Sequence, residues 1–372
     1  VASGEVRVIA KQDVADVAKI CGGLENIDFV MDNGAPTDVP AAAAEVHAFE
    51  AIVSNTVKPV VQEVKNAKQA EAIMKMAFAV AGGEEKFAQN PFAAIVVENE
   101  EALCISAEAA SVVAAAAAKG FPVVFSNKLI TGFTAPEESA GAIVAGLVNS
   151  LLALVLAEAT AEGAPFITGG FYTINDMDNE MNPYGAPEIS LINAGFAGVL
   201  RYLKVPSFGF GGGSDSKISD AQMGLEACLS LVHAGLAGTN LIYGAGIMET
   251  GNVASPYLLV IGDEIMGMTR RIMRGVEMDE DRLCRGVIDD VQPGGHYLGS
   301  EHTRYYFKDE QFWPKLMNRN RIDDWTAAGA KSLGQRAAEM TQQLLSVAAP
   351  QLLDDAVAAE LKKIVADAEA SL

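Results

Sequence analysis

The chain has 372 residues, half of them hydrophobic, which is enough for one large α/β domain with an appendage or for two ordinary domains. Its 27 Lys and Arg residues against 48 Asp and Glu residues give a net charge of −21. This charge would repel the phosphates of nucleic acid and an anionic membrane surface, so we expect neither as a partner. It is compatible with a cationic ligand, although solubility alone is the commoner reason for an acidic composition.

The cysteines and the longest apolar segment indicate the cellular compartment of the protein. Cys21, Cys104, Cys228 and Cys284 are widely spaced, with no CxxC motif and no histidine near them in a ligand pattern. This usage is typical of a reduced, cytoplasmic protein and predicts neither a disulfide framework nor a metal site. Residues 140–157 are apolar and alanine-rich, but two polar residues interrupt them, which favours a packed helix over a membrane span.

Apolar runs of strand length alternate with helical patterns along most of the chain. Seven such runs occur, at residues 27–31, 59–64, 92–97, 121–125, 165–168, 206–210 and 241–243. The helical patterns lie between them, at residues 38–54, 67–80, 100–119, 136–162, 187–203 and 220–238. Regular alternation of this kind predicts βαβ crossovers and a parallel sheet. Both an open doubly wound sheet and a barrel satisfy it, and short, evenly spaced strands that end in glycine or polar residues favour a TIM (β/α)8-type barrel.

One strand of an eight-stranded barrel is missing from this count. The further candidate, residues 6–9, is a poor barrel strand. We therefore expect the native protein to extend beyond Val1 and to carry its first strand there. We assign residues 1–292 to the barrel domain.

The pattern changes beyond residue 293. Residues 296–325 are aromatic and basic, and two helices with periodic apolar positions are predicted at residues 328–347 and 350–372. We expect residues 293–372 to form a C-terminal appendage that packs on the barrel or on a second subunit. A homodimer is thus one prediction.

Two glycine-rich strand ends are the most distinctive segments of the chain. Residues 206–217, PSFGFGGGSDSK, and residues 240–256, NLIYGAGIMETGNVASP, each begin as a buried strand and continue into glycines followed by small polar and acidic residues. Such ends lie at the carboxyl edge of an α/β sheet, where its chemistry is found. Polar residues also follow other predicted strands: Asp32, Asn33, Gln62, Glu63, Glu98, Asn99, Ser126 and Asn127. Each alone is equally well explained as a helix cap or turn residue, but with the nearby aromatic residues they predict a pocket that holds an ammonium ion by cation–π contact and a compensating charge.

Common catalytic motifs are absent from the sequence. It has no P-loop, no GxSxG and no HExxH, and residues 209–214 match the dinucleotide fingerprint GxGxxG only in part. The four histidines do not form a set. Conventional acid–base catalysis is therefore poorly provided for.

Several segments resemble the trimethylamine methyltransferase family: LITGFTAPEESAG (129–141), PFITGGFYTINDM (165–177), YGAPE (184–188), GGSDSKISDAQMGLE (212–226), GTNLIYGAGIMETG (238–251), DEIMGMTRRIMRGVE (263–277) and PGGHYLGSEHT (293–303). The resemblance implies a TIM barrel that moves a methyl group from a methylated amine to Co(I) of a corrinoid. That corrinoid is carried on a separate partner protein, and the resemblance implies no covalently bound cofactor and no metal in this chain. The archaeal trimethylamine enzymes hold a pyrrolysine at the position that aligns with Ser255. The chain is therefore similar to the non-pyrrolysine branch, whose members demethylate quaternary amines such as glycine betaine.

The resemblance also suggests roles for individual residues. Asp215 and Glu249 are the candidate catalytic residues, acting as countercharges or orienting groups. The candidates for substrate binding are Phe171, Tyr184 and Tyr243 as walls of an aromatic cage, with Ser214 and Ser255 as polar contacts. A quaternary ammonium leaves as a neutral amine, so it needs no acid, and the lack of a histidine relay is expected. Two alternatives stay open: a non-catalytic subunit that binds a betaine or docks the corrinoid protein, and a corrinoid methyltransferase for another methylated amine such as trimethylamine.

Overall fold

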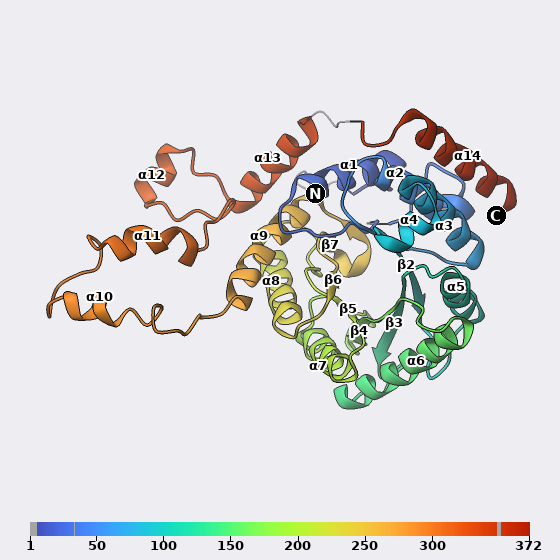
Figure 1. Cartoon of the computed structure of the whole chain (residues 1–372), viewed down its shortest axis with the longest axis horizontal. Coiled ribbons are helices and arrows are strands. Elements are labelled where there is room, and N and C mark those ends of the chain that lie inside the picture. Colours follow the sequence, from blue (N-terminus) through green and yellow to red (C-terminus); the bar gives the residue numbers. More distant parts are fainter. Residues whose placement is uncertain (1–5, 33, 348–350) are drawn as a thin grey trace.

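The structure, a computed structural model, describes residues 6–32, 34–347 and 351–372; Asn33 and Pro350, expected at a strand end and a helix start, lie outside the described residues. Its centre is a six-stranded sheet of parallel strands that follow one another in chain order. The strands are β1 Val60–Glu63, β2 Ala93–Asn99, β3 Val123–Thr131, β4 Phe166–Ile174, β5 Ser207–Phe210 and β6 Leu241–Tyr243. The sheet curls with helices on its outer side (Figure 1), which confirms the predicted α/β fold of TIM-barrel type.

The predicted strand at residues 27–31 is wrong in extent. Only Val30 joins the sheet, through a parallel bridge to Val60. Asp28 instead forms an ion pair with Arg270 of helix α9 (Pro256–Met273), which ties this segment to the helix and not to β1. The predicted seven strands are therefore six strands and one bridge.

Helices cover the outer face of the sheet. Those between successive strands are α3 Ala67–Ala81, α4 Glu84–Gln89, α5 Ala107–Ala118, α6 Ser139–Thr160, α7 Pro187–Leu203 and α8 Ala221–Leu236. Preceding β1 are α1 Lys11–Gly23, the 3-10 turn η1 Ala41–Ala43 and α2 Ala44–Val53. The helical patterns predicted all of these except α1 and α4. The helix α5 begins later than its pattern indicated, because Ser106 caps it by accepting from the Ala109 N–H at 3.1 Å.

The helix α6 is the most apolar of the barrel wall. Within the described ranges it is the one helix long and apolar enough to cross a membrane, with a mean hydropathy of 2.2, and 39% of its most apolar window is buried inside the protein. It packs against β3, β4, α5 and α7. Its outer side leaves Val144, Leu151 and Val155 exposed.

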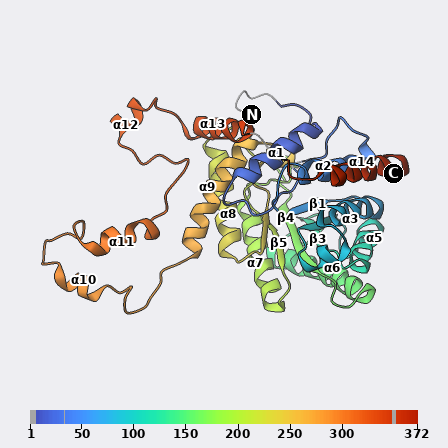
Figure 2. The same cartoon turned by 45° about the horizontal axis from the view of Figure 1, so that its top comes forward.

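The chain after α9 leaves the barrel and returns to it. Residues 274–332 carry α10 Arg285–Asp290, α11 Glu301–Glu310 and α12 Ile322–Ala327 and extend away from the barrel (Figures 1 and 2). Leu316 is the one buried residue in this range. The helix α13 (Leu333–Ser346) then packs on α1 and α9, and α14 (Asp355–Ser371) packs on α2 and α3. A domain boundary at residue 293 stays a prediction.

Two consecutive glycines allow three strands to approach closely at the centre of the sheet. Gly169 and Gly170 in β4 have φ of +152° and +134°. A Cβ at Gly169 would lie 1.7 Å from the Phe208 carbonyl oxygen of β5, and a Cβ at Gly170 would lie 2.0 Å from the Asn127 carbonyl oxygen of β3. Backbone on both sides therefore excludes any side chain at these positions.

We expect Gly170→Ala to lower the free energy of unfolding by about 3 kcal/mol or more, because the methyl group would meet backbone and the φ angle is unfavourable for alanine. The matched control is Gly198→Ala in α7, where an added Cβ would meet no atom within 4 Å. That variant should raise stability by about 0.5–1 kcal/mol through helix propensity. Denaturant unfolding of the two variants measures both effects, and equal stabilities would contradict the close strand contact.

Candidate active site

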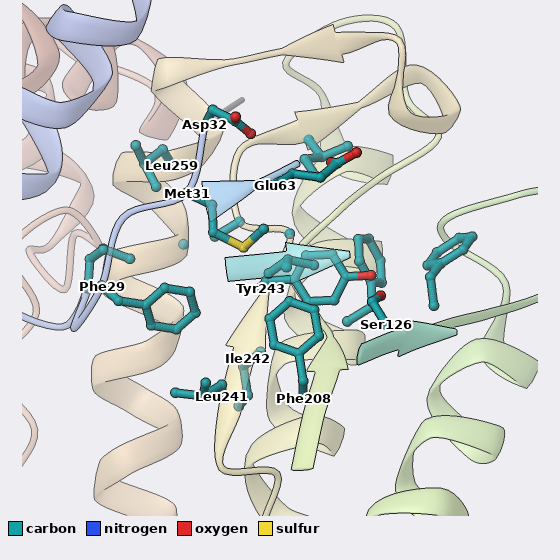
Figure 3. A pocket seen from close by; sticks show the side chains of 18 of the residues that line it. Phe29, Met31, Asp32, Glu63, Ser126, Phe208, Leu241, Ile242, Tyr243 and Leu259 are labelled. Atoms are coloured by element: carbon teal, nitrogen blue, oxygen red, sulfur yellow. The ribbon is translucent and has the colours of Figure 1, made fainter. Parts of the chain in front are cut away.

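A cavity of about 570 Å³ opens at the carboxyl ends of the strands. It is bounded by the sheet on one side and by residues 27–32 and α9 on the other. Figure 3 shows Asp32 and Glu63 at its acidic end, the rings of Tyr243 and Phe208 on its floor, and Phe29 and Met31 facing them. Parallel strands deliver their carboxyl ends to one edge, which is why residues far apart in the chain meet here.

Aromatic rings form a continuous wall of the cavity. Phe171 of β4 contacts Tyr184 of the β4–α7 loop with ring centroids 4.3 Å apart, and Phe210 of β5 lies 5.0 Å from Phe171 and 5.2 Å from Tyr184. Phe210 also lies 5.6 Å from Tyr243 of β6, which stacks on Phe208 at 4.2 Å. Phe208 and Phe210 share a face because side chains alternate along a strand. Phe171, Phe208 and Phe210 are buried by these contacts, so Tyr184 and Tyr243, which are half-buried, are the rings with accessible surface in the cavity.

The two phenols of this wall stay neutral. Burial raises the pKa of Tyr184, and it raises the pKa of Tyr243 well above its ordinary value. The nearby carboxylates act in the same direction. The Tyr243 hydroxyl points toward Ser126 at the end of β3 (Figure 3).

The charged residues of the cavity are mostly acidic. The carboxylates that line it are Asp28, Asp32, Glu45, Glu63 and Glu98, and the cations that line it are Lys65, Lys128 and Arg270, of which Arg270 forms an ion pair with Asp28. Lys65 forms an ion pair with Glu63. Lys128 lies 3.9 Å from Glu98 and 2.8 Å from Glu100, which follows β2. Carboxylates thus outnumber the ammonium groups around the cavity.

Two of these carboxyl groups have strongly raised pKa values. Burial, and then the charge of Glu63, raises the pKa of Asp32 to about 7. The same two causes raise the pKa of Glu98 to about 7. Loss of water penalises a charged carboxylate, and a neighbouring negative charge adds to that penalty. A cation placed in the cavity would reverse the second effect.

Three of the residues singled out from the sequence line the cavity: Phe171, Tyr184 and Tyr243. The other four lie just behind its wall or beside it. Ser255 is fully buried and caps α9 by accepting from the Leu258 N–H at 3.3 Å, and Ser214 is also fully buried. Asp215 accepts hydrogen bonds from two backbone N–H groups of the β4–α7 loop. The functional roles of these four residues stay predictions.

Glu249 lies in the turn that follows β6. A small hairpin of β7 (Ile247–Met248) and β8 (Val253–Ala254) holds the 3-10 turn η2 (Glu249–Gly251) between its strands. Glu249 and Thr250 both have positive φ, 49° and 52°. This conformation is unfavourable for a β-branched residue such as threonine, so the turn is strained next to the cavity, which Gly251 lines.

The acidic end of the cavity was not selected from the sequence. Asp32, Glu63 and Glu98 belong to the strand-end polar residues noted above, yet nothing in the sequence distinguished them from structural residues such as Asn99, whose side chain bonds the backbone of Cys104 and Ser106. Their signal is a position at or near the end of an apolar run, next to a neighbouring run that ends in a like charge. No separate feature of the sequence selected Lys65 and Lys128.

The fold also brings one histidine next to a cysteine. The sequence places no histidine near a cysteine, but folding of residues 274–332 brings the Cys284 sulfur within 3.0 Å of His302 Nε2. The part of the chain that the structure describes contains no group of three or more His, Cys, Asp or Glu side chains that could hold a metal ion. All four cysteines are free thiols.

Comparison with known proteins supports a common family. The family model of the trimethylamine methyltransferase MTTB matches residues 3–372. The trimethylamine methyltransferase MttB of Desulfitobacterium hafniense is 35% identical to the chain, over 98% of this chain and 73% of that protein. The glycine betaine methyltransferase of the same species is 29% identical, over 98% of this chain and 76% of that protein.

A solved structure supports the fold. The crystal structure of the hydroxylamine complex of MtmB superposes with a TM-score of 0.51 at 13% identity, over 96% of this chain and 70% of that chain. The relatives above are named methyltransferases, which agrees with the resemblance read from the sequence motifs. The match to the family model over nearly the whole chain is decisive: the chain belongs to the trimethylamine methyltransferase family, and it is a methyltransferase.

Proposed function

We propose that the chain transfers a methyl group from a quaternary amine of the betaine type to Co(I) of a corrinoid on a partner protein. The observation that carries this proposal is the combination of an aromatic wall with excess carboxylates in one cavity. The family supports methyl transfer, and the two relatives named above are called trimethylamine and glycine betaine methyltransferases. The corrinoid enters from the resemblance, as a methyl acceptor that the partner supplies.

The cavity suits a methylated cation. Its methyl groups spread the positive charge, so it gains little from single hydrogen bonds and more from ring faces at van der Waals distance. Tyr184 and Tyr243 supply such faces, Phe171 and Phe210 pack behind them, and Glu98 supplies a negative charge at their edge. For a betaine, the substrate carboxylate would turn toward Lys128, the cation that lines the same side.

The reaction needs little acid–base chemistry from this chain. Two electrons of Co(I) form the new cobalt–carbon bond, the nitrogen–carbon bond breaks, and its electron pair stays on the nitrogen of a neutral tertiary amine. No proton moves in this step. The task of the cavity is therefore to exclude water, to orient one methyl group outward and to stabilise the cation.

The remaining assignments are part of this proposal. Glu249, on the strained turn beside Gly251, is the proposed orienting group, and Asp215, Ser214 and Ser255 support the wall from behind. The exposed segment 274–332 is the proposed contact for a second copy or for the corrinoid protein, because apolar side chains such as Leu298 and Tyr305 are more than seven-tenths exposed there. The free thiols agree with a cytoplasmic location.

Trimethylamine is the second candidate substrate, because a relative at 35% identity is named for it. Ser255, where the resemblance expects pyrrolysine in the archaeal trimethylamine enzymes, favours the quaternary amines instead.

We expect methyl transfer to a reduced corrinoid protein with at least one betaine from a panel of glycine betaine, carnitine, γ-butyrobetaine and proline betaine. The absorbance change from Co(I) to methyl-Co(III) reports the reaction directly. Tyr243→Leu should raise KM about tenfold because it removes a ring face, whereas Tyr243→Phe keeps the ring and should change KM little. Turnover with trimethylamine alone would replace this proposal by the second candidate, and saturable betaine binding without turnover would contradict a betaine as the methyl donor.

The affinity for a quaternary amine should fall as pH falls through about 7. Asp32 and Glu98 both have a pKa of about 7, so they are mostly charged at pH 8 and mostly neutral at pH 6. The dissociation constant should therefore rise about tenfold from pH 8 to pH 6, which is the ratio of the ionised fractions of one such carboxyl group. Choline is the probe for calorimetry because its ammonium charge does not titrate.

Two variants complete this pH experiment. Glu98→Gln should weaken choline binding at pH 8 and leave only the part of the pH dependence that comes from Asp32, whereas Glu101→Gln, whose side chain is exposed and does not line the cavity, should keep both. The uncharged isostere 3,3-dimethylbutanol should show no pH dependence. A choline dissociation constant that stays constant between pH 6 and pH 8 would contradict the role of these carboxylates.

A further inference from the structure

Tyr184 connects two loops at the rim of the cavity. Its ring packs on Phe171 and Phe210, as described above, and its hydroxyl lies so close to the η2 turn that a Cβ on Gly251 would come within 2.6 Å of it. Both Tyr184 and Gly251 line the cavity. The position of this one ring therefore decides the width of the cavity between the β4–α7 loop and the turn.

The loop that carries Tyr184 has few contacts of its own. Residues 177–181 are exposed, and the loop is closed on itself by a bridge between Asp176 and Met181. Thr173 at the end of β4 donates to the Pro183 carbonyl oxygen at 2.5 Å. The helix α7 that follows begins after Ala186, which provides no side-chain cap. The hydrogen bonds within residues 176–181 do not reach the N–H groups of Tyr184 and Gly185, which are bonded from outside the loop.

Asp215 is the partner of these two N–H groups. Its Oδ1 accepts from the Tyr184 N–H at 2.6 Å, and its Oδ2 accepts from the Gly185 N–H at 2.7 Å. Both oxygens of the carboxylate are thus used by adjacent backbone groups just before α7, where the helix dipole also favours a negative charge. Asp215 does not line the cavity, so it acts on a ligand through Tyr184.

Glu226 of α8 holds Asp215 in turn. Its Oε2 accepts from the Asp215 N–H at 2.8 Å and from the Ser214 hydroxyl at 2.7 Å. It also packs so tightly on the loop that a Cβ on Gly185 would lie 2.3 Å from its Cδ. Gln222 donates to its other oxygen at 2.8 Å, which fixes the carboxylate on the helix.

We propose that Asp215 and Glu226 form a bracket that positions Tyr184 and thereby determines which amines the cavity accepts. The bracket is defined by Asp215, Glu226 and the two N–H groups of Tyr184 and Gly185. Asp215 and Glu226 are positioning residues, and neither touches the ligand. The specificity part of this inference rests on the proposed function, whereas the bracket itself is a property of the loop.

A double-mutant cycle tests the specificity part. Tyr184→Ala should raise KM for the best betaine about tenfold with kcat changed less than about threefold, because it removes binding surface and leaves the reacting methyl group in place. Asp215→Ala should raise KM about fivefold, and the double variant should be no worse than Tyr184→Ala alone. Effects that multiply would show that Asp215 acts on the substrate independently of Tyr184 and would overturn the proposal.

Matched variants separate the bracket from loss of charge or of stability. Glu188→Gln removes a carboxylate from the first turn of α7 without touching the bracket, and KM should stay unchanged. Asp215→Asn keeps the shape but offers one acceptor oxygen instead of two, so its KM should lie between those of the native protein and Asp215→Ala. Glu226→Gln keeps an acceptor oxygen and should retain more of the native KM than Glu226→Ala. Thermal unfolding of each variant shows that it is folded.

Proteolysis tests the bracket without any amine. Glutamyl endopeptidase cleaves after Glu180, an exposed residue of the same loop, and Glu180→Gln identifies that cut. Asp215→Ala and Glu226→Ala should be cut there at least about threefold faster than the native protein, because the loop opens more often. Unchanged cleavage would overturn the bracket. Faster cleavage without saturable amine binding would keep the bracket and reject the proposed function.

Discussion

The removal of water from carboxylates at the strand ends is the constraint on which the site depends. Asp32 and Glu98 are half-buried beside Glu63, and loss of water together with the Glu63 charge raises the pKa of both carboxyl groups to about 7. The parallel sheet creates this situation because β1 and β2 end side by side. A ligand that brings a fixed positive charge into the cavity removes the conflict. The same constraint accounts for Lys65 and Lys128, which compensate part of the charge and leave the rest for a ligand.

The shape of the cavity follows from the backbone. Gly169 and Gly170 let β4 contact both neighbouring strands. Backbone atoms of those strands occupy the space that a Cβ at either glycine would need. Phe171 then follows directly, and its ring meets those of Tyr184 and Phe210. A rigid strand end therefore carries the aromatic wall, whereas only Tyr184 comes from a loop. This difference explains why one ring needs a bracket and the others do not.

Two kinds of carboxylate surround the site. Glu98 faces the cavity and is raised in pKa by burial, whereas Asp215 accepts from two backbone N–H groups and serves the loop. Both follow a glycine-rich or apolar strand in the sequence. Their roles differ because the Glu98 side chain lines the cavity, whereas the Asp215 side chain is directed to the β4–α7 loop. Local folding of the segment 274–332 likewise brings together two polar side chains, Cys284 and His302, that are 18 residues apart in the sequence.

The sequence by itself determined the parallel α/β class, the helices α2, α3 and α5 to α8, the family, and three residues that line the cavity: Phe171, Tyr184 and Tyr243. These follow from periodicity, from turn residues and from motifs, all of which are local in the chain. Tertiary structure alone decided that residues 27–31 contribute a bridge at Val30 and not a strand, and it placed Asp28 beside Arg270 far along the chain. It also decided which strand-end acids face the cavity. Burial and hydrogen-bond partners come from segments distant in sequence, so no local pattern distinguishes Glu98 from Asp215.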